Sequence, residues 1–282
     1  MIECRVEQAE RLKNFTDNHC AQASFFFTSL LKNKEIKVNG KKVSTDVWLQ
    51  EGDVVCYYLT PKQESVAAFY SVYEDQQICI VDKESGVNSQ AVHEALLRKG
   101  TYYFVHRLDR NTKGLLAFAK TQEAEQELLA AFRTHTLQKI YHALCFGVPN
   151  RKSAALTAYL KKDSKKSLVR IFEKSVIGAD KIITEYSVLQ ADGEFSKLEI
   201  YLHTGKTHQI RAHMAYIGCP VVGDMKYGNN LKNKALGVAR QCLVAKTLRF
   251  SFTGVLAYLN NQTFSSRFEV ELPKPTGQGC VE

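Results

Sequence analysis

The sequence predicts an α+β protein in which helices flank a mixed, largely antiparallel central sheet, with a second, small α+β domain at the N-terminus. Asn39-Gly40 and Asp192-Gly193 each join two segments of alternating polar and apolar residues, which is typical of β-hairpins. The expected helices do not alternate regularly with strands, as they would in a doubly wound parallel sheet. A polar stretch after residue 60 favours a boundary, so we expect domains at residues 1–62 and 69–282, joined by a linker at 63–68.

Residues 1 to about 60 are expected to form two helices followed by a basic hairpin. Apolar residues recur at helical spacing between residues 9 and 15, and the apolar segment 25–31 predicts a second helix. The stretch 36–43 predicts a strand, a tight turn and a strand, and a further strand is expected at 54–59. The basic residues of this part are candidate phosphate contacts: Lys32, Lys34, Lys37, Lys41 and Lys42.

The larger domain is expected to combine helices and strands in an irregular order. A helix capped by Asn88 or Ser89 is expected to end before Gly100. Thr121 is expected to cap a second helix, and a short third helix is expected to start at Thr207. Strands are expected at 69–73, 77–81, 114–119, 140–146, 168–172, 182–189, 198–202, 243–252 and 264–272.

Composition excludes several classes of protein. The 282 residues are 45% hydrophobic, which is typical of a folded globular chain. No run of 18 apolar residues occurs, so we expect no membrane-spanning helix, and the N-terminal residues lack the apolar segment of a signal peptide. The eight cysteines are scattered without a Cys-x-x-Cys pair, which argues against a zinc ribbon or a redox dithiol. We therefore expect a cytoplasmic protein with reduced thiols.

The chain is basic, with a formal net charge of +9 and a pI near 9.0. Such a charge attracts phosphate backbones, which favours a nucleic-acid partner. A basic surface without any partner fits the charge equally well. The motifs therefore have to decide between the two interpretations.

Two stretches gather polar and charged residues. Residues 106–114 read His-Arg-Leu-Asp-Arg-Asn-Thr-Lys-Gly, and residues 203–213 read His-Thr-Gly-Lys-Thr-His-Gln-Ile-Arg-Ala-His. Unpaired charge is costly to bury, so neither stretch is expected in a core. Either one alone could be an ordinary loop, but the two together favour a functional site.

These stretches resemble motifs of the RluA-type pseudouridine synthases, which read His-Arg-Leu-Asp-x-x-Thr-Ser-Gly and Leu-x-Thr-Gly-Arg-x-His-Gln-Ile-Arg-x-His. Residues 139–144 resemble that family's Lys-x-Tyr-x-Ala segment, and residues 218–227 resemble its Gly-x-Pro-Ile-x-Gly-Asp-x-x-Tyr segment. The resemblance covers roughly residues 66–272 and implies the pseudouridine synthase fold and an isomerase that acts on RNA without cofactor or metal. The N-terminal part resembles S-four-like RNA-binding modules.

The resemblance also assigns roles to individual residues. It makes Asp109 the catalytic carboxylate, which acts at the sugar of an extruded uridine either as a nucleophile or by assisting an elimination. Arg211 is the cation expected to pair with Asp109, and Tyr141 is the aromatic residue that can stack on uracil and move a proton. Arg107 is expected to enter the RNA stack where the base leaves, and His106 is expected to order the loop. The further candidate RNA contacts are Lys206 and His208.

Simpler interpretations stay open for several of these residues. Arg211 could form a surface salt bridge, Tyr141 could be a core tyrosine, and Arg107 could bind phosphate only. The chain also departs from the family pattern at Lys113, which replaces Ser, and at Lys206, which replaces Arg and loses planar, bidentate bonding. Glu84 replaces the proline of the family's Lys-Pro-x-Gly segment. These departures bear on substrate fit and loop geometry.

Two rival functions are each favoured by part of the sequence. A metallohydrolase would use His203, His208 and His213, but residues five apart on a helix face different directions, whereas zinc ligands on one helix are three or four apart. A non-catalytic RNA-binding assembly factor would suit the basic N-terminal part, but it has no use for Asp109, Tyr141 and Arg211 together. We expect a monomer that acts on structured RNA, with ribosomal RNA favoured over transfer RNA and no membrane partner.

Overall fold

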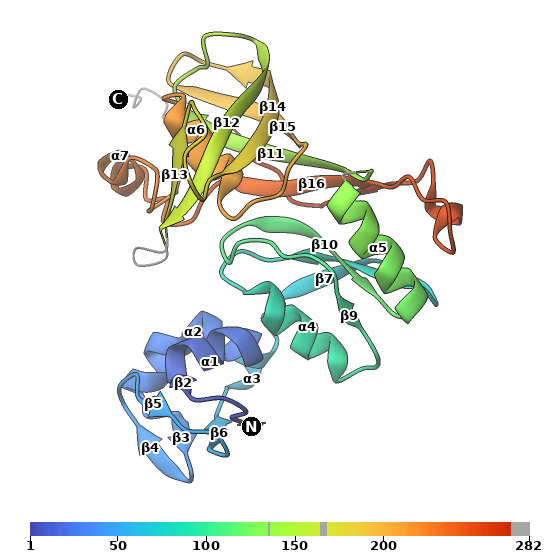
Figure 1. The fold of residues 1–282 in the computed structure, drawn as a ribbon. Coiled ribbons are helices and arrows are strands. Elements are labelled where there is room, and N and C mark those ends of the chain that lie inside the picture. Colours follow the sequence, from blue (N-terminus) through green and yellow to red (C-terminus); the bar gives the residue numbers. More distant parts are fainter. Residues whose placement is uncertain (135, 164–167, 272–282) are drawn as a thin grey trace, which may run out of the picture. The chain divides into compact units, whose positions relative to one another are not determined.

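The computed structural model describes residues 1–134, 136–163 and 168–271 (Figure 1). The chain divides into two compact units. The first unit contains Met1–Leu137 and Thr247–Arg267, and the second contains Gln138–Lys246 and the segment that begins at Phe268. This division groups the N-terminal residues with the chain up to 137, so it differs from the predicted domains 1–62 and 69–282, which stay a prediction. None of the described helices is long and apolar enough to cross a membrane.

The N-terminal part of the first unit packs two helices against a small antiparallel sheet of order β1-β6-β3-β4, beside a short pair β2-β5. Asn39 and Gly40 both have positive φ, +49° and +76°, as the predicted two-residue hairpin turn between β3 and β4 requires. Leu12, Phe15 and Leu30 bring the helices into one apolar cluster with the sheet. The elements are β1 (Ile2–Arg5), β2 (Glu10–Arg11), α1 (Leu12–His19), α2 (Ala21–Lys32), β3 (Ile36–Val38), β4 (Lys41–Val43), β5 (Trp48–Leu49) and β6 (Val54–Tyr57).

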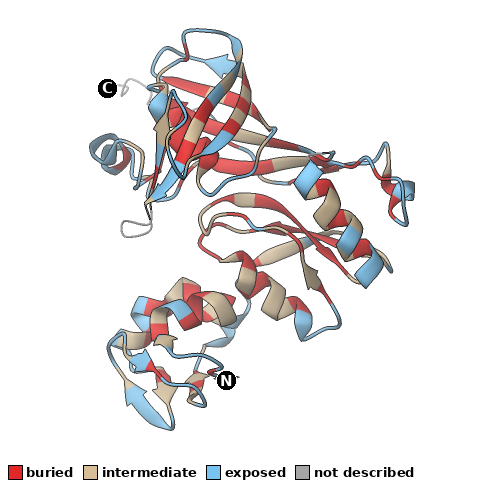
Figure 2. Cartoon of the chain, in the orientation of Figure 1, coloured by how far each residue is buried: buried red, intermediate tan, exposed pale blue. Residues whose placement is uncertain are grey.

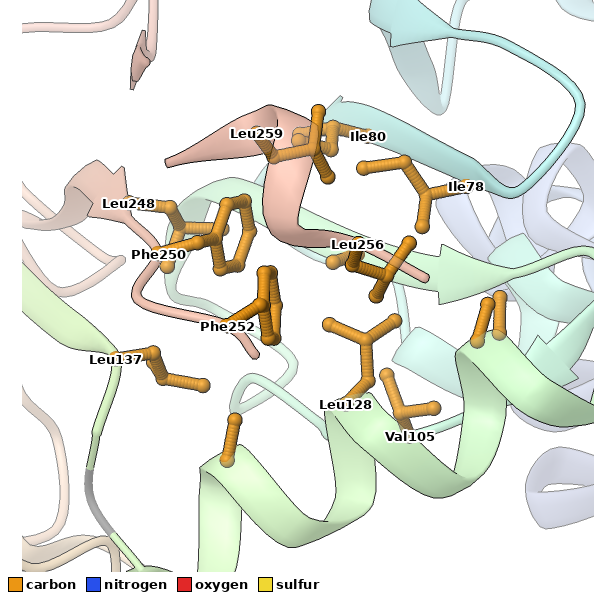
Figure 3. Close-up of a cluster of buried hydrophobic side chains, with 14 of the residues drawn as sticks. Ile78, Ile80, Val105, Leu128, Leu137, Leu248, Phe250, Phe252, Leu256 and Leu259 are labelled. Atoms are coloured by element: carbon orange, nitrogen blue, oxygen red, sulfur yellow. The ribbon is translucent and has the colours of Figure 1, made fainter. Parts of the chain in front are cut away.

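The rest of the first unit is built on strands β7, β8 and β10, which pair antiparallel in that order. Its elements are α3 (Pro61–Glu64), β7 (Phe69–Glu74), β8 (Ile78–Lys83), α4 (Ser89–Leu97), β9 (Tyr103–Phe104), β10 (Lys113–Ala119), α5 (Gln122–Thr134), η1 (Ala257–Leu259) and β17 (Thr263–Ser265). β8 is buried along its whole length (Figure 2). Figure 3 shows Leu128 of α5 facing Phe252 and Leu256 in the cluster that also contains Ile78 and Ile80 of β8.

The second unit contains strands β13-β12-β14-β15-β11, which pair antiparallel in that order, and helix α6 packs on them. Ile210 and Met214 of α6 join the cluster of Ala143 and Leu198, while Ala212 joins that of Ala158, so the helix is held on both sides of its axis. The elements are β11 (Gln138–Phe146), β12 (Ser153–Asp163), β13 (Leu168–Phe172), β14 (Asp180–Ala191), β15 (Phe195–Leu202), α6 (Gln209–Tyr216), α7 (Asn230–Ala235) and β16 (Leu243–Arg249), the last of which ends in the first unit.

The α+β class and the largely antiparallel pairing confirm the prediction, and two element boundaries differ from it. The short helix begins at Gln209 and not at Thr207, because His208 has a φ of +56° and cannot continue a helix. The strand predicted at 264–272 is only β17, and its last predicted residue lies outside the described residues. Beyond β17, the backbone N–H of Arg267 donates to the side-chain carboxylate of Asp82 at 2.7 Å and not to the backbone of a neighbouring strand.

Candidate functional site

Asp109 lies in the loop between β9 and β10, residues 105–112, and its own backbone helps to shape the turn. The N–H of Thr112 donates to the carbonyl of Asp109 at 3.0 Å. Leu108 is buried, and its N–H donates to the Ser89 hydroxyl at 2.9 Å, while that hydroxyl donates to the Leu108 carbonyl at 3.1 Å. Arg107 is exposed. A buried anchor on one side and a tight turn on the other thus fix the backbone of a half-buried carboxylate.

A buried ammonium supports the same loop from the end of β8. Lys83 is fully buried, and its Nζ donates to the carbonyls of Glu84 at 2.9 Å, Val87 at 2.9 Å and Arg110 at 3.1 Å. Three acceptors match the three N–H bonds of an ammonium group. Burial lowers the pKa of Lys83 to about 7, and the negative charge of Asp109 acts in the opposite direction. Lys83 therefore joins three backbone carbonyls beneath the loop that carries Asp109.

His106 faces the interior of the first unit. Its Nε2 accepts a hydrogen bond from the backbone N–H of Ala117 at 2.9 Å. The ring stacks on Phe132 of α5, with centroids 4.3 Å apart and an angle of 25° between the planes. Both contacts join the loop to β10 and α5. They also turn the ring inward, which weakens the case for direct contact with RNA.

Arg211 lies on α6 in the second unit and is held by a buried carboxylate. Its Nε and Nη2 donate to the two oxygens of Asp224 at 2.7 Å and 2.9 Å, and only 6% of Arg211 is exposed. Asp224 also accepts the backbone N–H groups of Lys226 at 2.8 Å and Tyr227 at 3.1 Å. Burial alone raises the pKa of Asp224, but the bonds from Arg211 outweigh it and hold that pKa below its usual range. The interpretation of Arg211 as an exposed salt bridge is therefore wrong.

His208 precedes α6 and is fixed by an aromatic partner. Its Nδ1 is 2.8 Å from the Tyr227 hydroxyl, and the backbone N–H of Val169 donates to the same oxygen at 2.8 Å. The Tyr227 hydroxyl thus links the His208 ring to the backbone of Val169 at the start of β13. Lys206 lies on the exposed side of the same segment and forms an ion pair with Asp180 at 3.1 Å.

Tyr141 lies on β11, opposite Ile200 of β15. It is half-buried and packs against the apolar cluster that also includes Ile210 and Met214 of α6. The second unit thus brings Tyr141 and the α6 segment with Arg211 onto one shared cluster. Asp109 belongs to the first unit, and so do Arg107 and His106.

The candidate phosphate contacts of the N-terminal part gather on the β3–β4 hairpin. Lys37 lies directly opposite Lys42, and Lys41 lies opposite Val38. Like charges on paired residues destabilise a sheet, which an anion bound between them would relieve. Lys37 Nζ also lies 4.9 Å from the ring centroid of Tyr58. Lys32 is exposed at the end of α2, just before the hairpin.

Comparison with known proteins identifies the family. Residues 77–216, which include Asp109, Tyr141 and Arg211, match the family described as RNA pseudouridylate synthase. An uncharacterised RNA pseudouridine synthase of Mycoplasma pneumoniae is 34% identical over 260 residues, which cover 80% of this chain and 79% of the relative. The chain belongs to the RNA pseudouridine synthase family.

Two further comparisons agree with this membership. The ribosomal large subunit pseudouridine synthase C of Vibrio cholerae is 31% identical over 276 residues, 86% of this chain and 85% of the relative. The solved structure of human RNA pseudouridylate synthase domain containing 1 is 26% identical, with a TM-score of 0.57 over 65% of this chain and 79% of the human one. The resemblance inferred from the motifs is thus confirmed, and so is the pseudouridine synthase fold.

The three histidines of the rival metal site have separate partners in this synthase. His203 Nε2 lies 2.8 Å from a Glu185 oxygen, whereas His213 Nδ1 lies 3.0 Å from the Thr184 hydroxyl. Burial lowers the pKa of His213 to about 4. Within residues 1–134, 136–163 and 168–271, no group of three His, Cys, Asp or Glu side chains could hold a metal ion.

Sequence reasoning missed the side chains that hold the synthase's site residues in place. The sequence places Asp224 in the 218–227 segment without indicating Arg211 as its partner, and it indicates no role for Lys83, which precedes the Glu84 that replaces the family's proline. One signal for Lys83 was available: it ends a strand whose residues are otherwise apolar apart from Asp82, where a charge is expensive to bury. The contact between Arg110 and Asp17 joins residues 93 apart, and no local pattern indicates it.

Proposed function

We propose that the protein converts one or a few uridines of ribosomal RNA to pseudouridine, with Asp109 as the catalytic carboxylate. The observation that carries this proposal is the fixed backbone of the loop around Asp109, with Leu108 anchored below and Lys83 bonded to three carbonyls beneath it. The family supplies the reaction. A relative named for the ribosomal large subunit supports ribosomal RNA as the substrate class.

The reaction defines what the residues have to do. The N1–C1′ bond of uridine breaks, a C5–C1′ bond forms, C5 loses its proton to water, and N1 is protonated. No electrons are gained or lost, so the balance contains no redox partner. We assign Asp109 to the sugar carbon, where an ionised carboxylate acts during the breaking and forming of these bonds. Arg211 is assigned as the cation of the catalytic machinery, and Tyr141 as the residue that stacks on the uracil ring.

Contacts to the RNA are proposed for two groups of residues. The exposed Arg107 enters the helix from which the target base has left, because the reacting carbon cannot be reached inside a base-paired stack. Lys206 and His208 bind near the target uridine, with His208 held by Tyr227. The hairpin lysines and the end of α2 bind phosphates of a structured region, as in S-four-like modules: Lys32, Lys37, Lys41 and Lys42.

The proposed substrate also indicates the compartment in which the protein works. We infer that the protein works in the cytoplasm, where ribosomal RNA is found in bacteria, and the free thiols of all described cysteines agree with a reducing compartment. A monomer is proposed, because one chain carries all the groups assigned above. Light scattering on the purified protein tests that assignment, and a dimer would contradict it.

The proposed function is tested by mapping pseudouridine in cellular RNA. Carbodiimide modification and primer extension are applied to RNA from a strain that lacks the gene, and the strain is complemented with the wild type or with Asp109→Asn. One or a few ribosomal RNA sites should lose the modification and regain it only with the wild type. Asp109→Asn should still bind RNA, which separates catalysis from binding. Loss of sites in transfer RNA alone would refute the ribosomal substrate, and restoration by Asp109→Asn would refute the mechanism.

A further inference from the structure

The residue that follows Asp109 reaches into the N-terminal part of the chain. The Arg110 guanidinium forms an ion pair with Asp17 of α1 through Nη1, and its Nη2 donates to the Ser24 hydroxyl of α2 at 3.1 Å. Its Nε donates to the carbonyl of Gly86 at 3.0 Å. One side chain therefore joins the loop that carries Asp109, the segment after β8, and both helices of the N-terminal part.

Asp17 is built into this junction and is not an exposed surface acid. Its side chain is only 10% exposed, and besides Arg110 it accepts hydrogen bonds from the Lys13 ammonium and, at 2.6 Å, from the Ser24 hydroxyl. The Ser24 hydroxyl thus donates to Asp17 and accepts from Arg110, which closes a triangle of polar contacts. A buried carboxylate with three charged or polar donors has a defined position, unlike an exposed ion pair.

A second contact joins α1 to α4, the helix that holds the Asp109 loop at Leu108. α1 packs on α4, and the Asn88 side chain donates to Asn18 of α1 at 3.0 Å (Figure 1). α4 begins at Ser89, whose hydroxyl holds Leu108 directly before Asp109. The N-terminal part therefore contacts the loop directly at Arg110, after Asp109, and indirectly at Leu108, before Asp109, through α4.

We propose that Asp17 is a positioning residue for the isomerisation: through Arg110 it sets the conformation of the Asp109 loop, so that the N-terminal RNA-binding part acts on the catalytic step as well as on RNA binding. This inference rests on the proposed function. It distinguishes the N-terminal part from a module that only increases the local concentration of RNA. A displacement of about 1 Å at a reacting group can cost about a hundredfold in rate, so small changes in this loop are measurable.

Charge separates the positioning role from a role in RNA binding. Asp17→Asn removes a negative charge from the basic N-terminal part, which strengthens its attraction for phosphate. A weaker interaction with RNA is therefore not expected from this variant. If its rate falls, the fall has to arise in a step after binding.

The test uses the full-length protein and ribosomal RNA transcribed in vitro with tritium at uridine C5, so that each isomerisation releases tritium to water. For Asp17→Asn we expect kcat to fall at least about tenfold, with KM and the Kd for RNA unchanged or lower. Asp53→Asn is the matched control. It makes the same change in charge within the N-terminal part, and it removes contacts to Asn39 and Gln50 without touching Arg110. Its kcat should equal that of the wild type.

Hydrogen exchange measured by mass spectrometry gives a second readout that does not depend on activity. The amide of Thr112 is bonded to Asp109, and the amide of Gly86 is bonded to the carbonyl of Arg110. Peptides that contain these amides should exchange faster in Asp17→Asn than in the wild type or in Asp53→Asn. If Asp17→Asn fails to fold, Ser24→Ala takes its place in the test. It removes only one hydroxyl from the triangle, so it should show the same changes in exchange, but smaller ones.

The outcomes separate this inference from the proposed function. An unchanged kcat and unchanged exchange in folded Asp17→Asn would overturn the inference, as would an equal fall of kcat in Asp53→Asn. The double variant Arg110→Gln, Asp17→Asn should be no slower than the slower of the two single variants, because each substitution alone already breaks the Arg110–Asp17 pair. Losses of kcat that add up in the double variant would contradict the inference that the two residues act as a pair. If wild-type protein releases no tritium from any transcript, the proposed function fails, and the exchange comparison alone then decides whether Asp17 holds the loop.

Discussion

The buried carboxylate of Asp224 holds Arg211, so replacing it with an isosteric amide tests how the proposed active-site cation is kept in place. Asp224→Asn preserves the shape of the side chain and one oxygen, but it removes the charge and one of the two acceptors of the bidentate pair. The Arg211 guanidinium would then be left buried without its counter-charge. Removing one partner of a buried pair costs about 3–5 kcal/mol, and the remaining oxygen places the expected loss near the lower end, at about 3 kcal/mol.

Urea unfolding followed by far-UV circular dichroism measures this loss. Asp180→Asn is the control, because its pair with Lys206 is exposed and should contribute less than about 1 kcal/mol. The pH dependence gives a further check. Since the pKa of Asp224 lies below its ordinary 3.8, its contribution is present above pH 3.8 and is lost as the pH falls further, so the two proteins should converge in acid. A loss below about 1 kcal/mol at pH 7 would refute the reasoning.

Three further predictions concern other charged groups. Lys83→Met should lower kcat in the tritium-release assay at least about tenfold, because it removes the three bonds that hold the Asp109 loop. The free energy of unfolding should change by less than about 2 kcal/mol, because the substitution also removes a buried charge. Full activity of Lys83→Met would contradict the supporting role. Lys42→Ala should weaken RNA binding and reduce the slope of log K against log salt by about 1, measured by filter binding, and an unchanged slope would exclude a phosphate contact. Burial raises the pKa of Glu269, but bonds from Lys246, His142 and Lys197 outweigh this and lower it to about 2, so its stabilisation is present above pH 4.5 and lost as the pH falls towards 2. Acid unfolding of Glu269→Gln should therefore lack this component, and an acid transition identical to that of the wild type would argue against these bonds.

Local patterns predicted much of the fold, because some structures are specified by neighbouring residues. The Asn39-Gly40 turn requires two positive φ values, which those residues adopt readily, and the hairpin forms as expected. Thr121 caps α5 through the N–H of Ala124 at 3.3 Å, again a contact between near neighbours. The helix expected at Thr207 begins two residues later, because His208 has a left-handed backbone conformation, and its ring lies 2.8 Å from the Tyr227 hydroxyl. That contact joins residues 19 apart, and local propensity does not indicate it.

In the candidate site, too, contacts between residues far apart in the sequence could not be predicted. The motifs predict that Asp109, Tyr141 and Arg211 carry the chemistry, which stays a prediction, and they do not indicate which side chains hold these residues in place. Asp224 and Lys83 are buried charges whose partners are set by tertiary packing, and Asp17 meets Arg110 across 93 residues. Such contacts depend on how the elements pack, so one sequence read by spacing and composition does not determine them. They are nevertheless the contacts from which the positions of Asp109 and Arg211 follow.

The account depends on Asp109 acting on uridine in RNA, and tritium release by purified protein tests this most directly. Wild-type protein and Asp109→Asn are each incubated with ribosomal RNA transcribed with tritium at uridine C5, and both are first shown to bind that RNA with the same Kd. The account predicts that the wild type releases tritium at one or a few equivalents per RNA and that Asp109→Asn releases none above background. Release by Asp109→Asn at the rate of the wild type would contradict it.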